Sequence, residues 1–241
     1  DGYPFGAAPV KPTGERYALD ADGLRLLAPV IPSKVYGLAK NYEAHAQFMH
    51  ESGHSEIAHA PEDMVIFSKP STSVIGPDDP IVIPSYSNDM NFEPEVAVIM
   101  GRIAKNVPVE KAMDYVLGFT CSQRRDAALT CEGLDPMWTR AKGFDTSCPL
   151  GPWIQTELDW KDAKISFTLN GEDVPMASGT TANLIHGIPE QIAAISSFST
   201  LLPGDVIMTG TPNASGHLDP GDEPIVHVAG IGSLRNVVVR G

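Results

Sequence analysis

Residues 92 to 100 have the sequence Phe92-Glu93-Pro94-Glu95-Val96-Ala97-Val98-Ile99-Met100, and no other segment of the chain is as informative. Because alternate residues of a strand share a face, Glu93 and Glu95 point to one side together with Ala97 and Ile99. Two neighbouring carboxylates on an apolar strand repel each other unless a positive charge lies between them, and hard divalent cations favour such oxygen ligands. The segment therefore predicts a strand with a candidate metal site. The alternative is a solvated strand end with both acids in water.

Most of the remaining chain also has the patterns of strands. Short strand-like runs occur at residues 34–38, 64–69, 81–84, 164–169, 205–209, 224–228 and 236–240. Asn170-Gly171 predicts a two-residue hairpin turn between two of the apolar runs. Two helices are expected, one with an apolar stripe from Val109 to Leu117 that ends at Gly118, and one that Pro189 opens.

These elements predict an α+β fold that is mainly β. The helices are too few for the alternating βα units of a Rossmann or TIM architecture. The chain has neither a P-loop nor a strand-linked Gly-x-Gly-x-x-Gly motif, so nucleotide chemistry has little support. Residues 1–30 are rich in Pro and Gly and weakly patterned, which predicts an irregular arm.

The charge of the chain limits its partners. Its 241 residues include 17 Lys and Arg against 30 Asp and Glu, which leaves a formal charge of −13. An acidic protein repels nucleic acid and anionic lipid, and no run approaches the ~18 apolar residues that a membrane helix needs, so neither nucleic acid nor membrane is an expected partner. The odd number of cysteines, without a Cys-x-x-Cys pair, favours a reducing cytosol and a cytoplasmic protein. An anionic substrate would need a local positive charge, from a divalent cation or a buried lysine.

Three further segments hold candidate catalytic or binding residues. Lys142 lies between Trp138 and Phe144, where a partly desolvated lysine pairs with a carboxylate or stabilises an enolate; the alternative is a surface lysine whose stem covers apolar neighbours. Thr211 lies in a turn after a strand-like run, where backbone amides can approach an anion; the alternative is a simple tight turn. His45 lies on a short helix beside a polar stretch, and a lone histidine is more often a surface or packing residue than a base.

Together these segments resemble the fumarylacetoacetate hydrolase family over nearly the whole chain, from about Leu26 to the end. Each motif is short, but their number and order make the match specific. The motifs are Lys40-Asn41-Tyr42-Glu43-Ala44-His45, Phe67-Ser68-Lys69-Pro70, Glu93 to Gly101, Asp114 to Thr120, Trp138 to Asp145, Leu150-Gly151-Pro152, Asn170-Gly171-Glu172, Pro203-Gly204-Asp205 and Thr209-Gly210-Thr211-Pro212. The branch it resembles contains bacterial 2-hydroxyhepta-2,4-diene-1,7-dioate isomerases, acylpyruvate hydrolases and oxaloacetate decarboxylases.

The resemblance implies a mixed β-rich roll that assembles as a homodimer and binds Mg²⁺ or Mn²⁺ through a Glu-x-Glu pair and one later aspartate. It also implies activity on a small 2-oxo acid, such as an acylpyruvate, fumarylacetoacetate, oxaloacetate or a 2-hydroxydienedioate. Residues 1–30 would then be the remnant of a small N-terminal domain, and residues 31–241 the catalytic domain.

Residue by residue, the resemblance assigns Glu93 and Glu95 to the metal pair and Lys142 to the lysine near the metal. His45 matches the base that a mobile lid carries, and Thr211 matches a residue that contacts the substrate carboxylate.

The place of the third metal ligand departs from the family pattern. Counting forward from Gly118, the aspartate's position falls on Arg124, and counting back from Trp138 it falls on Arg125. A small local insertion would make Asp126 the third ligand. An arginine in that place would repel the cation or replace its charge, which makes Arg124 a candidate substrate-binding residue.

The lid, which we expect to span residues 42–63 and to close over a bound 2-oxo acid, is a second departure. Family hydrolases often have a glutamate three residues after the histidine, which completes a His–Glu dyad. Here Phe48 stands in that place, while Glu51 lies further on and would reach His45 only if the helix ended early. Glu51 is therefore a candidate catalytic residue. A third departure is Asn213-Ala214-Ser215-Gly216, where the family commonly has a Gly-Val-Gly turn.

The leading hypothesis is a metal-dependent hydrolase, isomerase or decarboxylase. The 2-oxo acid would chelate the metal, Lys142 would stabilise the enolate with it, and His45 would move a proton. The incomplete dyad favours decarboxylation or isomerisation over hydrolysis. The alternative is a non-catalytic family member with a degenerate metal site that binds a small anion, with Arg124 or Arg125 where the cation would be.

Overall fold

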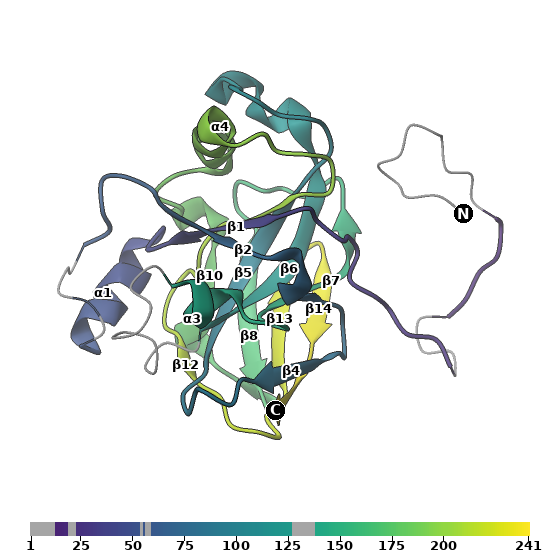
Figure 1. Cartoon of the computed structure of the whole chain (residues 1–241), viewed down its shortest axis with the longest axis vertical. Helices are drawn as coiled ribbons and strands as arrows, with labels where there is room; N and C mark the ends of the chain where they lie inside the picture. The colour runs from purple at the N-terminus through teal and green to yellow at the C-terminus, as the bar shows by residue number, and fades with distance from the viewer. Residues whose placement is uncertain (1–12, 19–22, 54, 56–58, 127–137) are drawn as a thin grey trace.

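The computed structural model describes residues 13–18, 23–53, 55, 59–126 and 138–241, and for residues 124–126 it describes the backbone alone. The described strands form three sheets (Figure 1). The largest has the order β2-β1-β11-β5-β6-β7-β3, with β12 paired to β5. Its strands are β1 Val35–Ala39, β2 Val65–Lys69, β3 Val74–Ile75, β5 Asn91–Met100, β6 Val116–Asp126, β7 Cys148–Gln155, β11 Val206–Met208 and β12 Gly216–His217.

The other two sheets are smaller. The five-stranded sheet has the order β10-β8-β13-β14 with β9 on β8, and the remaining sheet pairs β15 with β4. Their strands are β8 Lys164–Leu169, β9 Glu172–Asp173, β10 Gly179–Thr180, β13 Pro224–Val228, β14 Gly232–Arg235, β4 Pro80–Ile83 and β15 Val237–Arg240. The predicted α+β fold that is mainly β is confirmed.

Strand β5 lies at the centre of the large sheet, antiparallel to β6 on one side and to β11 on the other. All its residues after Asn91 are buried, because both of its faces are covered. Phe92, Val96 and Val98 face the core shared with the five-stranded sheet, where the Phe92 ring stacks on Phe167 at 4.3 Å between centroids. The opposite face packs Ala97 and Ile99 into a second apolar cluster that includes residues of β1, β7 and β11. This second face is the one that carries Glu93 and Glu95.

The described helices lie around the strands, with α1 at one side of the body and α4 above the sheets in Figure 1. They are α1 Glu43–Glu51, α3 Thr139–Gly143 and α4 Ile188–Phe198, with 3₁₀ turns at Ser71–Ser73, Val109–Tyr115, Pro175–Ala177 and Thr181–Asn183. Helix α4 confirms the prediction at Pro189: it buries Ile188, Ile192 and Ile195 completely, and each such side chain contributes about 1.5–3 kcal/mol. In the described part of the chain, no helix has the length and apolar character of a membrane span.

The expected helix from Val109 to Leu117 is wrong in type and in its end. A 3₁₀ turn ends at Tyr115, and Val116 and Leu117 already belong to β6. The 3₁₀ turn packs against α4 and the strand after it pairs with β5. The apolar residues of these two short elements together have the spacing that is typical of one helix. The hairpin at Asn170-Gly171 is confirmed, since both residues have positive φ between β8 and β9. The described residues of the predicted arm, 13–18 and 23–30, contain neither helix nor strand, and its status as a domain remnant stays a prediction.

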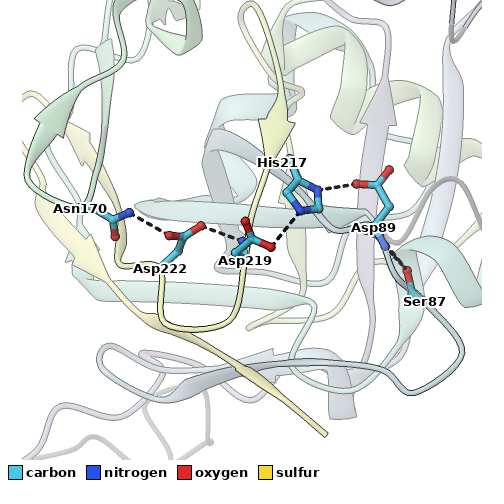
Figure 2. A network of polar contacts seen from close by, with 6 residues as sticks. All are labelled: Ser87, Asp89, Asn170, His217, Asp219 and Asp222. Atoms are coloured by element: carbon cyan, nitrogen blue, oxygen red, sulfur yellow. Dashed lines mark hydrogen bonds and ion pairs between the residues drawn. The ribbon is translucent and has the colours of Figure 1, made fainter.

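A polar network fastens the segment that follows β11 to the rest of the body (Figure 2). His217 on β12 contacts Asp89 at 2.7 Å and Asp219 at 3.3 Å. Asp222 accepts from the backbone N–H of Asp219 and from the side chain of Asn170, both between 2.7 and 2.8 Å. The network therefore anchors one end of residues 209–217, and the other end contacts Glu95 through Gly210.

Candidate active site

The two glutamates of β5 are buried, not solvated. Glu93 is 3% exposed and Glu95 is 0% exposed, which excludes a strand end in water. Glu95 Oε2 accepts a 2.7 Å hydrogen bond from the Gly210 N–H, and the Thr211 hydroxyl lies 3.4 Å from Oε1. The antiparallel pairing of β5 with β11 brings these two residues past Glu95 as the chain leaves the strand.

Gly210 has a special conformation at this contact. Its φ of +109° favours glycine, and a Cβ there would lie 3.0 Å from the Cβ of Asn41. Asn41 holds the same turn from the other side: its amide donates to the carbonyls of Thr209 at 2.9 Å and His186 at 3.1 Å. The Asn41 Oδ1 accepts from the His186 N–H at 2.9 Å. No local pattern marks Asn41 as a site residue, and the structure places it as the link between the β11 turn, α1 and the segment before α4.

Lys142 comes from α3 and points at Glu93. Its Nζ lies 3.6 Å from Glu93 Oε2, and Lys142 as a whole is 6% exposed. The rings of Phe67 and Trp138 each have their centroid 5.6 Å from Nζ. The interpretation of Lys142 as a surface lysine is therefore wrong, and its expected position beside a carboxylate is where the structure puts it.

His45 reaches the other oxygen of the same carboxylate. It is 3% exposed, and its Nε2 lies 3.8 Å from Glu93 Oε1. Its Nδ1 lies 2.6 Å from the backbone carbonyl of Asn213. Since a carbonyl only accepts, Nδ1 carries the proton, and in neutral His45 the lone pair of Nε2 faces Glu93. Two acceptor atoms at this distance repel unless a proton or a cation shares the space beside them.

The structure does not bring Glu51 to this site. Glu51 ends α1 on its exposed side, where Oε1 accepts from Gln47 at 2.7 Å. Glu51 lies six positions after His45, so on a continuous helix their side chains point in different directions. Phe48 is only partly buried. Residues 54 and 56–58 of the expected lid lie outside the described residues, and the closure of the lid stays a prediction.

The backbone register of β5 and β6 fixes the position opposite each glutamate. It pairs Glu93 with Arg124, Glu95 with Ser122 and Asn91 with Asp126, without a shift between them. In this register Arg124, and not Asp126, lies directly opposite Glu93, while Asp126 lies two positions further along the strand. Directly opposed residues share a face, so positions 124 and 126 both belong to the face of Glu93. The side chains at 124–126 lie outside the described residues, and their roles remain predictions.

Two buried hydroxyl groups lie near Glu95. Ser122, its neighbour across the strand pair, and Tyr42, at the start of α1, are buried, and their oxygen atoms have no hydrogen-bond partner in the described part of the chain. Burial, and secondly the charge of Glu95, raises the pKa of the Tyr42 hydroxyl, so that it remains a neutral donor. A buried hydroxyl without a partner is costly unless a water or a ligand satisfies it. A water or a ligand oxygen beside Glu95 would satisfy these two hydroxyls.

A second buried lysine lies on the same side of the sheet. Lys69 is 2% exposed, and the β1–β2 register places it opposite Val35 of the second apolar cluster. Its Nζ donates to the carbonyl of Ser147 at 2.8 Å. Burial raises the pKa of the neighbouring Cys148 thiol to about 11, with Lys69 lowering it and Glu95 raising it. The Cys148 thiol is therefore neutral. Lys69 could not be recognised as a site residue from the sequence, because only the fold shows that it is buried.

Comparison with known proteins identifies the family to which the chain belongs. Residues 34–239 match the model of the fumarylacetoacetate (FAA) hydrolase C-terminal domain. The chain belongs to the fumarylacetoacetate hydrolase family. This confirms the resemblance drawn from the motifs, including the fold that it implied.

Relatives within the family have several activities. The chain is similar to the crystal structure of a 2-hydroxyhepta-2,4-diene-1,7-dioate isomerase from Mycobacterium marinum, with 38% identity, a TM-score of 0.85, and coverage of 100% of this chain and 86% of that one. It is 36% identical over 227 residues to the human mitochondrial oxaloacetate tautomerase FAHD2A, covering 88% of this chain and 69% of the relative. A maleylpyruvate hydrolase from Sphingobium sp. SYK-6, solved in complex with manganese(II) ion and pyruvate, has 30% identity, a TM-score of 0.73, and coverage of 89% and 74%.

The residues of this family member fit a divalent cation in part. Glu93 and Glu95 offer two buried carboxylates on one face, which is the oxygen chemistry that Mg²⁺ and Mn²⁺ prefer. The unpartnered hydroxyls near Glu95 are consistent with bound water, which Mg²⁺ commonly retains. Within the described residues, no group of three or more His, Cys, Asp or Glu side chains is arranged to hold a metal ion. Two protein carboxylates are thus in place, and the third ligand depends on Asp126.

Proposed function

We propose that this family member is a divalent-metal-dependent enzyme that moves a proton on a small 2-oxo acid through its enolate. The observation that carries the proposal is the arrangement around Glu93: His45 Nε2 lies 3.8 Å from one oxygen and Lys142 Nζ lies 3.6 Å from the other. A base and an ammonium thus converge on one buried carboxylate. Such a set suits proton abstraction beside a carbonyl, which needs a base and positive charge near the developing oxyanion.

Glu93 and Glu95 would hold Mg²⁺ or Mn²⁺, with Asp126 as the proposed third ligand. When bound, the cation would act as a Lewis acid that stabilises negative charge on the oxygens of the 2-oxo acid. The positive charge of the cation would also offset two repulsions, the one between the two carboxylates and the one between Glu93 and the Nε2 lone pair of His45. The manganese and pyruvate in the maleylpyruvate hydrolase complex support this part of the proposal.

His45 is the proposed base, and its surroundings define how it would work. The Asn213 carbonyl oxygen lies 2.6 Å from Nδ1 and accepts its hydrogen bond, so Nε2 is the atom that takes up the substrate proton. The same carbonyl stabilises the imidazolium that forms, because it accepts a hydrogen bond from a charged donor. His45 then returns the proton to a different atom of the substrate, which completes an isomerisation.

Lys142 and Thr211 are the proposed partners of the substrate oxygens. Lys142 is buried and carries three donors, so it can hold the oxyanion of the enolate while it pairs with Glu93. Thr211 is buried beside Glu95 and supplies a hydroxyl for the substrate carboxylate. Arg124, opposite Glu93 in the register, is a proposed second contact for that carboxylate.

Proton transfer is favoured over hydrolysis. Hydrolysis of an acylpyruvate needs a water that a His–carboxylate dyad activates, and here Nδ1 of His45 faces a neutral carbonyl while Glu51 lies exposed on α1. The names of two relatives, an oxaloacetate tautomerase and a dienedioate isomerase, support the same class of reaction.

The test is a pair of assays with Mn²⁺ present. Ultraviolet absorbance follows the conversion of enol to keto oxaloacetate, and a second assay follows the cleavage of acetylpyruvate. We expect turnover of oxaloacetate enol in the parent protein and a loss of about 10²-fold or more in His45→Gln. Glu51→Gln is the matched control and should keep parental rates, because Glu51 contacts Gln47 on the surface. Rapid acetylpyruvate cleavage with slow tautomerisation would overturn the preference for proton transfer.

A non-catalytic protein that binds a small anion is the second candidate. The observation that favours it is the register, which pairs Glu93 with Arg124 where a metal aspartate was expected. Absence of turnover and of Mn²⁺ binding, together with calorimetric binding of oxalate, would establish this alternative.

A further inference from the structure

We propose that Phe67 and Trp138 are positioning residues that form an aromatic clamp, which holds the ammonium of Lys142 against Glu93 and keeps water away from it. The part that concerns catalysis rests on the proposed function, since it assumes that Lys142 stabilises the oxyanion. The position of the ammonium is a separate physical claim that does not require activity.

The clamp consists of two rings from different elements. The centroid of the Phe67 ring on β2 and that of the Trp138 ring before α3 both lie 5.6 Å from Lys142 Nζ. The two rings meet edge to face, with centroids 6.2 Å apart and an interplanar angle of 80°. Glu93 Oε2 lies 3.6 Å from the same nitrogen. The two rings and the carboxylate thus surround the ammonium group of Lys142, and the Lys142 side chain is 8% exposed.

A glycine fixes the position of the Phe67 ring. The antiparallel register of β1 and β2 pairs Phe67 with Gly37. A Cβ at residue 37 would clash with Cζ of Phe67, so the ring occupies the space that a side chain would fill. The absence of that side chain lets the ring lie across β1, beside the site.

An unusual backbone conformation fixes the position of Trp138. Its φ of 61° and ψ of 10° are left-handed, which a bulky residue rarely adopts. Its carbonyl accepts the N–H of Lys142 at 2.9 Å, so the same residue opens the helical turn and covers the lysine four positions later. A strained conformation persists only when its surroundings hold it, and the contacts of the indole with Phe67 and Lys142 are such surroundings.

The physical need for a clamp follows from the nature of lysine. The ammonium is strongly hydrated and its four-carbon stem is flexible, so a lysine on a short surface helix extends its head toward water. Helix α3 spans only Thr139–Gly143 and both neighbours of Ala141 are cationic. Ring faces attract a cation electrostatically within about 6 Å and offer water no hydrogen bond of comparable strength. The clamp therefore directs the ammonium to Glu93 instead of to solvent.

Simple apolar packing is the competing interpretation, and substitutions separate the two. Trp138→Phe retains an aromatic face, whereas Trp138→Leu fills part of the same space without one. Phe67→Tyr and Phe67→Leu form a second pair on the other element. If packing alone mattered, the Leu variant and the aromatic variant at each position would have the same Lys142 reactivity and the same kcat, and would differ only in stability.

The test measures the reactivity of Lys142 directly. Each variant receives a short pulse of an amine-acetylating reagent, and mass spectrometry quantifies acetylation at Lys142, with the buried Lys69 as internal reference. Mn²⁺ calorimetry and thermal unfolding check the metal site and the fold. We expect the two Leu variants to acetylate Lys142 about 10-fold faster than the parent, while Trp138→Phe and Phe67→Tyr stay within about 3-fold.

We expect a matching effect on turnover. The kcat on oxaloacetate enol should fall about 10-fold in Trp138→Leu with KM nearly unchanged, and Trp138→Phe should keep the parental kcat. Equal labelling of Lys142 in the parent and in both Leu variants would overturn the clamp, as would equal behaviour of Leu and aromatic replacements. If one Leu variant fails to fold, the variant on the other element decides. If the parent protein turns over no 2-oxo acid, the proposed function fails, while the labelling comparison still decides whether the clamp exists.

Discussion

The hydrogen bonds of Asn41 allow a worked prediction for the architecture of the site. Its side chain donates to the carbonyls of Thr209 and His186 and accepts from the His186 N–H, at distances from 2.9 to 3.1 Å, and the residue is 1% exposed. Asn41→Ala removes one buried and two partly buried hydrogen bonds and leaves their backbone partners unsatisfied. At about 1 kcal/mol for each bond, the free energy of unfolding should fall by about 3 kcal/mol. For a chain of this size, each kcal/mol shifts the Tm by about 2–4 °C, so the expected fall is about 6–12 °C.

The assay is thermal unfolding of the parent protein, Asn41→Ala and Asn213→Ala at one pH. Asn213→Ala is the matched control, because Asn213 contacts His45 through its backbone carbonyl, which alanine retains. The control should lie within about 0.5 kcal/mol of the parent, the usual range for substitutions without a special contact. A Tm of Asn41→Ala within about 2 °C of the parent would show that Asn41 does not hold the β11 turn, and the reasoning would fail.

Further predictions concern catalysis, pH and assembly. Lys142→Met should lower kcat by about 10²-fold, which steady-state kinetics on oxaloacetate enol would show; parental turnover would make Lys142 a structural residue. The hydrogen bond to Asp89 raises the pKa of His217, so its stabilising effect is complete below the unfolded pKa and is lost as pH rises through the folded pKa. The Tm difference between the parent and His217→Gln should therefore be largest near about pH 5 and should shrink as the pH is raised through neutrality. We also expect a homodimer, so light scattering that gave the monomer mass of 25.8 kDa at micromolar concentration would contradict the family-based prediction.

The sequence predicted the elements whose local pattern and final environment agree. Strand β5 is one example, since its alternating faces correspond to two separate apolar clusters. Strands β8 and β13 were predicted with their observed bounds, and helix α4 was predicted from the proline at its start. In each of these, burial and local propensity favour the same structure.

Elements that depend on distant partners could not be predicted in this way. Strand β6 contains Ser122, Gln123, Arg124 and Arg125, and a polar run of this kind becomes a strand because β5 pairs with it along its length. Strands β7 and β14 were missed too, and they lie beside β6 and β13 in the folded chain.

The candidate site shows the same division. The Glu93–Glu95 spacing indicated a shared face from strand geometry alone, and the structure buries both. His45 and Lys142 converge on Glu93, although one lies about fifty residues before it in the chain and the other about fifty residues after it. Only the family resemblance indicated that these three residues belong to one site. Asn41 and Lys69 carry no local pattern that marks them, because their importance comes from burial against the turn after β11 and against Ser147.

The most direct test of the account is calorimetric titration of Mn²⁺ into the parent protein, Glu95→Ala and Glu172→Ala. Glu172 is an exposed residue of β9, away from the glutamates of β5, so its variant controls for the loss of one negative charge. We expect one Mn²⁺ site per chain in the parent and in Glu172→Ala, and loss of that site in Glu95→Ala. Equal Mn²⁺ affinity in all three proteins, or no binding to the parent, would contradict the claim that the paired glutamates hold the cation.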